Sequence, residues 1–162
     1  MVEIPLYGTA KAVMTRTVST VTPDTTIRDA AKLMSTARVS GLPVIDTENR
    51  VVGIVTEKDL LRSRVEDQKR EAWWLNLLAE GEKLAPDFVA YARAGNDIVR
   101  RIMHTDILTV TEETPLSEIA VMMVEKGIKR FPVVKDGKLV GIVSRGDLVR
   151  ALGQRQSKDN IF

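Results

Sequence analysis

The chain has 162 residues, 44% of them hydrophobic but only 4% aromatic, which predicts a folded protein with an aliphatic core. The absence of cysteine excludes disulfides and thiolate chemistry, and a net charge of +2 without a basic stripe argues against a nucleic-acid partner. No apolar run approaches the ~20 residues that cross a membrane, and Met1 to Ala10 does not resemble a signal peptide. We therefore expect a cytoplasmic protein with no membrane partner.

The chain contains an internal repeat. Thr20-Val21-Thr22 aligns with Thr109-Val110-Thr111 at an offset of 89 residues, and Val52 to Val55 aligns with Val140 to Val143 at an offset of 88. Chance similarity would not keep this register, so we predict a duplication. The predicted division is a first repeat, a helical insert and a second repeat, at residues 10–63, 64–97 and 98–153.

The first repeat predicts the element order β-α-β-β-α. Val18 to Val21 is typical of a short strand, and Thr25 is the expected N-cap of the helix that follows. Leu42 to Ile45 and Val51 to Val55 are apolar runs on either side of a turn, which predicts a hairpin. A last helix is expected to begin near Thr56, a natural capping residue.

The insert contains both tryptophans of the chain, Trp73 and Trp74. Its pattern predicts a helix over Glu66 to Glu80 and a second short helix over Phe88 to Arg93. We expect the tryptophan pair to pack on the module or across a dimer, and a ligand lid or a docking surface is the alternative.

The second repeat predicts the same elements. Thr114 is the expected N-cap of its first helix, with Pro115 at the first helical position. Asp136-Gly137 between two apolar runs is a strong hairpin signal, and Ser144 is expected to start the last helix.

Two motifs resemble the CBS-domain family. Gly53 to Asp59 and Gly141 to Asp147 each contain a glycine, an apolar strand, a Ser or Thr, two residues and an Asp, and Val39 to Val44 resembles the segment that enters the family's middle strand. The chain is therefore similar to stand-alone bacterial CBS pairs, or Bateman modules. The resemblance implies an α/β (α+β) fold of tandem β-α-β-β-α repeats with pseudo-twofold symmetry. It also implies a homodimer, and clefts between the repeats that bind AMP, ADP or ATP, or in some members NAD or S-adenosylmethionine.

The chemistry of the motif residues fits such a ligand. Asp59 and Asp147 could each accept hydrogen bonds from both ribose hydroxyls, and charge-assisted bonds are the stronger kind. Thr56 and Ser144 could donate to a phosphate at a helix N-terminus. The expected ligand-binding residues surround adenine, ribose and phosphate: Val18, Thr20, Val39, Ser40, Gly41, Thr56, Lys58, Asp59, Ile107, Thr109, Ile128, Lys129, Arg130, Ser144, Arg145 and Asp147.

The two clefts are expected to differ. Lys129 and Arg130 would recognise phosphate charge in the second repeat, where the first has the uncharged pair Ser40-Gly41. For Lys58 and Arg145, a role as solvated surface charges remains the alternative.

One alternative function stays open. A Ser or Thr followed three residues later by an acid is also an ordinary capping box, so the repeats could form a dimerisation scaffold with degenerate clefts. His104 is the only histidine and has no partner at metal-ligand spacing, so we expect it on the surface or beside the ligand. We expect no enzyme activity, no catalytic residue, no metal and no catalytic cofactor. A regulatory module would act on an effector protein that the sequence does not identify.

Overall fold

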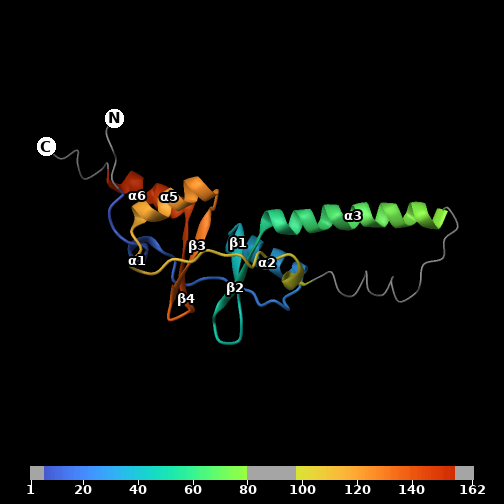
Figure 1. Ribbon diagram of the computed structural model, residues 1–162, viewed down its shortest axis with the longest axis horizontal. Helices are drawn as coiled ribbons and strands as arrows, with labels where there is room; N and C mark the ends of the chain where they lie inside the picture. Colours follow the sequence, from blue (N-terminus) through green and yellow to red (C-terminus); the bar gives the residue numbers. More distant parts are fainter. Residues whose placement is uncertain (1–5, 80–97, 156–162) are drawn as a thin grey trace. The chain divides into compact units, whose positions relative to one another are not determined.

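A computed structural model of the chain describes residues 6–79 and 98–155 (Figure 1). It contains both helices and short paired strands, which confirms the predicted mixed fold class. The elements in chain order are α1 (Ala10–Val13), α2 (Ile27–Ala37), β1 (Gly41–Ile45), β2 (Val51–Thr56), α3 (Glu57–Ala79), the 3₁₀ helix η1 (Val99–Arg101), α5 (Leu116–Lys126), β3 (Arg130–Lys135), β4 (Lys138–Ser144) and α6 (Arg145–Arg155).

The chain divides into two compact units that interleave in sequence. Unit 1 contains residues 1–18, 47–51 and 108–162, and unit 2 contains residues 19–46 and 52–107. Unit 1 therefore combines α1, from the start of the first repeat, with the hairpin of the second. Unit 2 combines η1, from the start of the second repeat, with β1 and most of β2.

Unit 2 is built on the two-stranded sheet β1–β2. Its core is aliphatic, as the composition predicts, and consists of Val21, Ala30, Met34, Leu42, Val44, Val55 and Val99. The backbone of η1 is hydrogen-bonded to the segment before α2, because the Val99 N–H donates to the Thr25 carbonyl at 2.8 Å.

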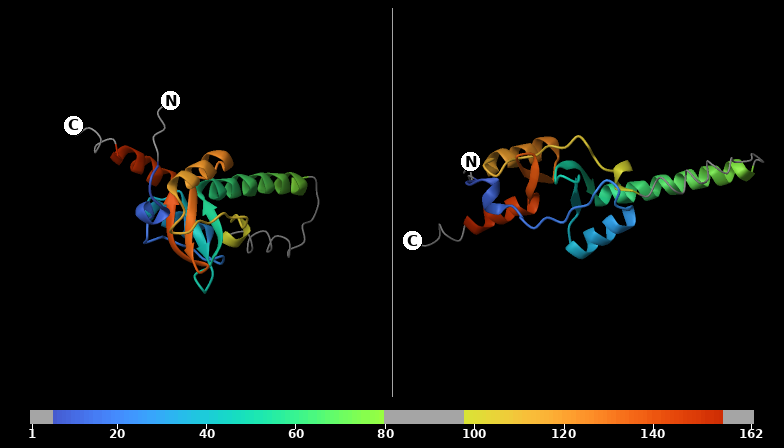
Figure 2. Two further views of the ribbon diagram at one scale, coloured as in Figure 1. Left: turned by 60° about the vertical axis from the view of Figure 1, so that its left-hand side comes forward. Right: turned by 90° about the horizontal axis from the view of Figure 1, so that it is seen from below.

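Unit 1 is built on the antiparallel sheet β3–β4, beside which α5 and α6 lie in all views (Figures 1 and 2). Its buried core is Ala10, Met14, Val110, Leu116, Ile119, Met123, Phe131, Val133, Val143 and Leu148. The hairpin turn is the predicted one. Asp136 and Gly137 both have positive φ angles, 51° and 77°, which is the type I′ geometry that a two-residue hairpin loop favours.

The predicted strand over Val18 to Val21 is wrong: only Val21 pairs, through a single parallel bridge with Val44. The Val21 N–H donates to the Pro43 carbonyl at 3.1 Å, and the Ile45 N–H donates to the Val21 carbonyl at 2.9 Å. Extending the pairing toward Ser19 would need an N–H on Pro43, which proline lacks. Val110 in the second repeat forms the same single parallel bridge, with Val133. Its N–H donates to the carbonyl of Pro132 at 3.0 Å.

The first helix of each repeat begins one residue later than predicted. Thr26 is the N-cap of α2, and its hydroxyl accepts from the Asp29 N–H at 3.1 Å. Pro115 occupies the N-cap position of α5. Thr25 and Thr114 instead close the preceding turns, where their hydroxyl oxygens accept at 3.0 Å from the N–H groups of Thr22 and Thr111.

The last helices begin where predicted, directly after Thr56 and Ser144. α3 continues without a break to Ala79, so the last helix of the first repeat and the first predicted insert helix are one element. The side chains of Trp73 and Trp74 and the predicted helix over Phe88 to Arg93 lie outside the described residues. No helix in the described part of the chain is long and apolar enough to cross a membrane.

Candidate functional site

A close backbone contact at Gly53 positions the first candidate site. The N–H groups of Ile54 and His104 each donate to the other residue's carbonyl, at 2.9 and 2.8 Å. A Cβ atom on Gly53 would lie 2.9 Å from the His104 carbonyl oxygen, so only glycine lets the His104 segment approach β2 this closely. Gly141 has the same role in unit 1, where Ile142 pairs with Thr15.

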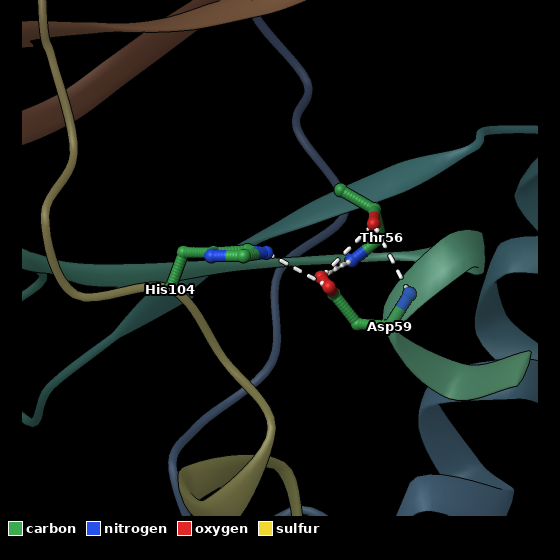
Figure 3. A network of polar contacts seen from close by, with 3 residues as sticks. All are labelled: Thr56, Asp59 and His104. Atoms are coloured by element: carbon green, nitrogen blue, oxygen red, sulfur yellow. Dashed lines mark hydrogen bonds and ion pairs between the residues drawn. The ribbon is translucent and has the colours of Figure 1, made fainter. Parts of the chain in front are cut away.

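Asp59 lies on the first turn of α3 and is almost fully buried, with 3% of its surface exposed. Its Oδ2 accepts from the Thr56 N–H at 2.8 Å and from the Thr56 hydroxyl at 2.9 Å (Figure 3). Its Oδ1 lies 2.8 Å from Nε2 of His104. Because a carboxylate only accepts, Nε2 is the donor. Oδ2 of Asp59 therefore accepts the hydrogen bonds at the helix start, and Oδ1 accepts the hydrogen bond from His104.

Asp147 has the equivalent geometry in unit 1 and is 6% exposed. Its Oδ2 accepts from the Ser144 N–H at 2.7 Å and from the Ser144 hydroxyl at 3.0 Å. Arg150, one turn further along α6, donates to its Oδ1. Each carboxylate therefore accepts through Oδ2 from the Thr or Ser that precedes its helix. The partner of Oδ1 differs, because it is His104 for Asp59 and Arg150 for Asp147.

The loops that enter β1 and β3 lie against these helix starts. The Glu57 N–H donates to the Ser40 carbonyl at 3.0 Å, and the Arg145 N–H donates to the Lys129 carbonyl at 2.8 Å. Arg130 pairs with Ser144 in the β3–β4 register. Predicted residues that are distant in sequence are thus brought together at each aspartate.

The remaining predicted residues divide between the units. Unit 2 contains Thr20, Val39, Gly41, Lys58 and Ile107, whereas unit 1 contains Val18, Thr109 and Ile128. Lys58 and Arg145 are exposed, as are Val39 and Lys129, and Gly41 is buried. Val18 and Ile107 therefore fall in different units from the aspartates of their own repeats.

Two contacts of the aspartates were not predicted from the sequence. Arg150 is three residues after Asp147, and Arg62 has the same spacing from Asp59, so the repeat contained a signal for the first contact. His104 was expected on the surface or beside a ligand, and its contact with Asp59 was not predicted. The described residues contain no cluster of three or more His, Cys, Asp or Glu side chains that could hold a metal ion.

Comparison with known proteins identifies the family and the fold. The CBS domain model matches residues 10–66 and 99–154, and the chain belongs to the CBS-domain family. An uncharacterized 17.7 kDa protein of Acidianus ambivalens is 34% identical over 141 residues, which cover 86% of this chain and 70% of that protein. The chloroplast protein CBSX1 of Arabidopsis thaliana is 34% identical over 81% of this chain, but the match spans only 57% of CBSX1.

Solved structures share the fold over nearly the whole chain. The crystal structure of Arabidopsis thaliana CBSX2 in complex with AMP matches with a TM-score of 0.70 at 33% identity, covering 91% of this chain and 98% of CBSX2. A putative acetoin utilization protein of Vibrio cholerae matches with a TM-score of 0.71 at 25% identity, covering 97% and 99% of the two chains. The chain is thus a CBS pair.

Proposed function

We propose that this CBS pair is a regulatory module that binds an adenine nucleotide at Asp59 and Asp147 and catalyses no reaction. The observation that carries the proposal is the pair of buried carboxylates, each held at a helix start beside a Thr or Ser hydroxyl. A relative of 33% identity has been crystallised with AMP, which supports the ligand class.

Each site can supply the groups that a nucleotide needs. A carboxylate accepts from ribose hydroxyls, and the positive end of a helix dipole suits a phosphate. Lys129 and Arg130 add two positive charges beside Ser144, where the first repeat has Ser40 and Gly41. We therefore propose that phosphorylated ligands prefer the Asp147 site.

The proposed regulation requires a partner. The ligand would shift the module between two states through its different affinities for them. We propose that the chain acts in the cytoplasm as a homodimer and passes this change to an effector protein.

The central test is loss of binding in two conservative variants. Asp59→Asn and Asp147→Asn keep an oxygen that can cap the helix but remove the charge that strengthens hydrogen bonds from ribose. We expect each variant to lose binding at one site, with affinity there about tenfold to a hundredfold weaker. Isothermal titration calorimetry with AMP, ADP, ATP, NAD and S-adenosylmethionine measures the affinities and the number of sites.

A matched control is Asp67→Asn, the same change further along α3, at a residue paired with Arg64 and Arg70 instead. It should leave binding unchanged. If no adenine ligand binds the unaltered chain at millimolar concentration, the proposed function is wrong.

A dimerisation scaffold with degenerate clefts is the second candidate, because both carboxylates already have partners. It predicts no ligand response, and dimerisation that is unaffected by Asp59→Asn and Asp147→Asn. Analytical ultracentrifugation with and without AMP distinguishes the two candidates.

A further inference from the structure

We propose that Arg150 is a positioning residue for the ribose of a ligand at Asp147, and that Gly146 provides the room for it to reach the carboxylate. The inference rests on the proposed function and adds a residue that sets the ribose preference at one of its two sites. The equivalent arginine of the first repeat, Arg62, lacks this role.

The first step is the orientation of the Asp147 carboxyl group. The last torsion angle of an aspartate side chain is soft, so anchoring one oxygen does not fix the plane of the carboxyl group. Both oxygens of Asp147 are anchored, because Ser144 donates to Oδ2 through its N–H and its hydroxyl, and Arg150 donates to Oδ1. Arg150 therefore completes the fixed geometry of a carboxylate that is almost fully buried.

The second step is that this geometry leaves a place for the ligand. A carboxylate has about four acceptor positions, two on each oxygen. The contacts of Asp147 use two positions on Oδ2 and one on Oδ1, so Oδ1 can also accept from a ribose hydroxyl while Arg150 stays bound. Because the strength of a hydrogen bond depends on its direction, an Oδ1 that is already oriented binds ribose more tightly than one that rotates.

The third step is the space beside Gly146. A Cβ atom added to Gly146 would lie 3.6 Å from Nη1 of Arg150 and 3.7 Å from the hydroxyl oxygen of Ser144. The guanidinium thus folds back past this glycine toward the carboxylate. A methyl group fits at that distance, whereas a long charged side chain would occupy the same space. Gly146 therefore lets an exposed arginine reach the buried Asp147.

The first repeat has a lysine at the equivalent position. Lys58 aligns with Gly146 at an offset of 88 residues, and Arg62 lies where the second repeat has Arg150. Lys58 and Arg62 are four residues apart on α3, a spacing at which like charges repel each other. We therefore expect Lys58 to keep Arg62 away from the carboxylate of Asp59.

The contacts of Asp59 agree with this expectation. Among the described residues its donors are Thr56 and His104, as Figure 3 shows, and Arg62 is not one of them. The arginine is present in both repeats, but it contacts the aspartate only in the repeat that has the glycine. Arg62 is thus a matched control for Arg150.

The experiment measures how much of the affinity comes from the ribose hydroxyls. AMP is compared with dideoxy-AMP, which lacks both hydroxyls, so the ratio of the two affinities separates the ribose contribution from that of the phosphate. Isothermal titration calorimetry uses the Asp59→Asn chain, which keeps the Asp147 site. We expect this chain to bind AMP about tenfold more tightly than dideoxy-AMP.

Arg150→Met, made in the Asp59→Asn chain, removes the donor and keeps an unbranched side chain. We expect the affinity ratio to fall from about tenfold to about twofold, because Oδ1 of Asp147 is no longer held. Arg150→Lys should restore most of the ratio, since an ammonium group can still donate to Oδ1. Circular dichroism checks that each variant is folded.

Two changes at Gly146 test the room that it provides. Gly146→Lys installs the residue of the first repeat and should lower the ratio as Arg150→Met does, although Arg150 is still present. Gly146→Ala should leave the ratio unchanged, because its methyl group makes an ordinary contact at 3.6 Å. The matched control, Arg62→Met in the Asp147→Asn chain, should not change the ratio at Asp59.

The outcomes separate this inference from the proposed function. Equal affinities for AMP and dideoxy-AMP in the Asp59→Asn chain, a ratio that survives Arg150→Met, or an equal loss of affinity for both nucleotides overturns the role of Arg150 and leaves nucleotide binding standing. A ratio that survives Gly146→Lys overturns the role of Gly146. If neither nucleotide binds the unaltered chain, the proposed function is contradicted and this inference with it.

Discussion

At the scale of single residues, the two repeats depend on glycines that allow close backbone contacts. Gly53→Ala would place a methyl group 2.9 Å from the His104 carbonyl oxygen and 2.9 Å from the Met103 sulfur. Since the carbonyl belongs to paired backbone, it must move, and we expect the free energy of unfolding to fall by about 1–3 kcal/mol. Urea denaturation followed by circular dichroism measures the loss.

The control for Gly53→Ala is Gly153→Ala, in α6, where an added methyl group meets nothing within 4 Å. Alanine favours a helix over glycine, so this variant should be neutral or more stable by up to about 1 kcal/mol. A Gly53→Ala chain as stable as the unaltered one would show that the close contact is relaxed in solution.

At the scale of elements, the helices α2 and α5 end in the same way with different residues. Arg38 ends α2 with φ 54°, and Gly127, 89 residues later, ends α5 with φ 64°. This left-handed conformation is strained for arginine and unstrained for glycine. We expect Arg38→Gly to stabilise the chain by about 0.5–1 kcal/mol, since the greater freedom of glycine in the unfolded chain offsets part of the gain.

The reverse change provides the check. Gly127→Ala meets no atom within 4 Å, so its cost is the backbone strain alone, and it should destabilise the chain by about 1 kcal/mol. Thermal denaturation should show a higher melting temperature for Arg38→Gly and a lower one for Gly127→Ala. Loss of stability in Arg38→Gly would indicate that the arginine side chain makes contacts that outweigh the strain.

The elements also show what could be predicted from the sequence. Helix starts after Thr56 and Ser144, and the Asp136-Gly137 turn, were predicted because each depends on residues within a few positions. The strand at Val18 to Val21 was not excluded, because the proline that limits it, Pro43, lies on the partner strand. The His104–Asp59 bond spans 45 residues. It could not be inferred from the repeat either, since the aligned residue is Thr15.

At the scale of the whole molecule, the start of each repeat belongs to the unit that contains the other repeat's hairpin. The Thr15 N–H donates to the Ile142 carbonyl at 2.9 Å, and the Ala10 N–H donates to the Thr114 carbonyl at 2.9 Å. Met14, 8% exposed, is part of the buried core of unit 1, and Met103 packs against the core of unit 2. A substitution that removes packing near the N-terminus should therefore destabilise the C-terminal hairpin β3–β4.

We expect Met14→Ala to destabilise unit 1 by about 2–5 kcal/mol, because it removes a buried side chain and leaves a cavity. Hydrogen exchange followed by mass spectrometry should show faster exchange in β3, β4 and α5, more than 100 residues away in sequence, with less change in α2 and β1. Met103→Ala is the matched variant and should give the opposite pattern. Faster exchange confined to α2 and β1 in Met14→Ala would mean that each repeat folds on its own segment, contrary to the interleaved units.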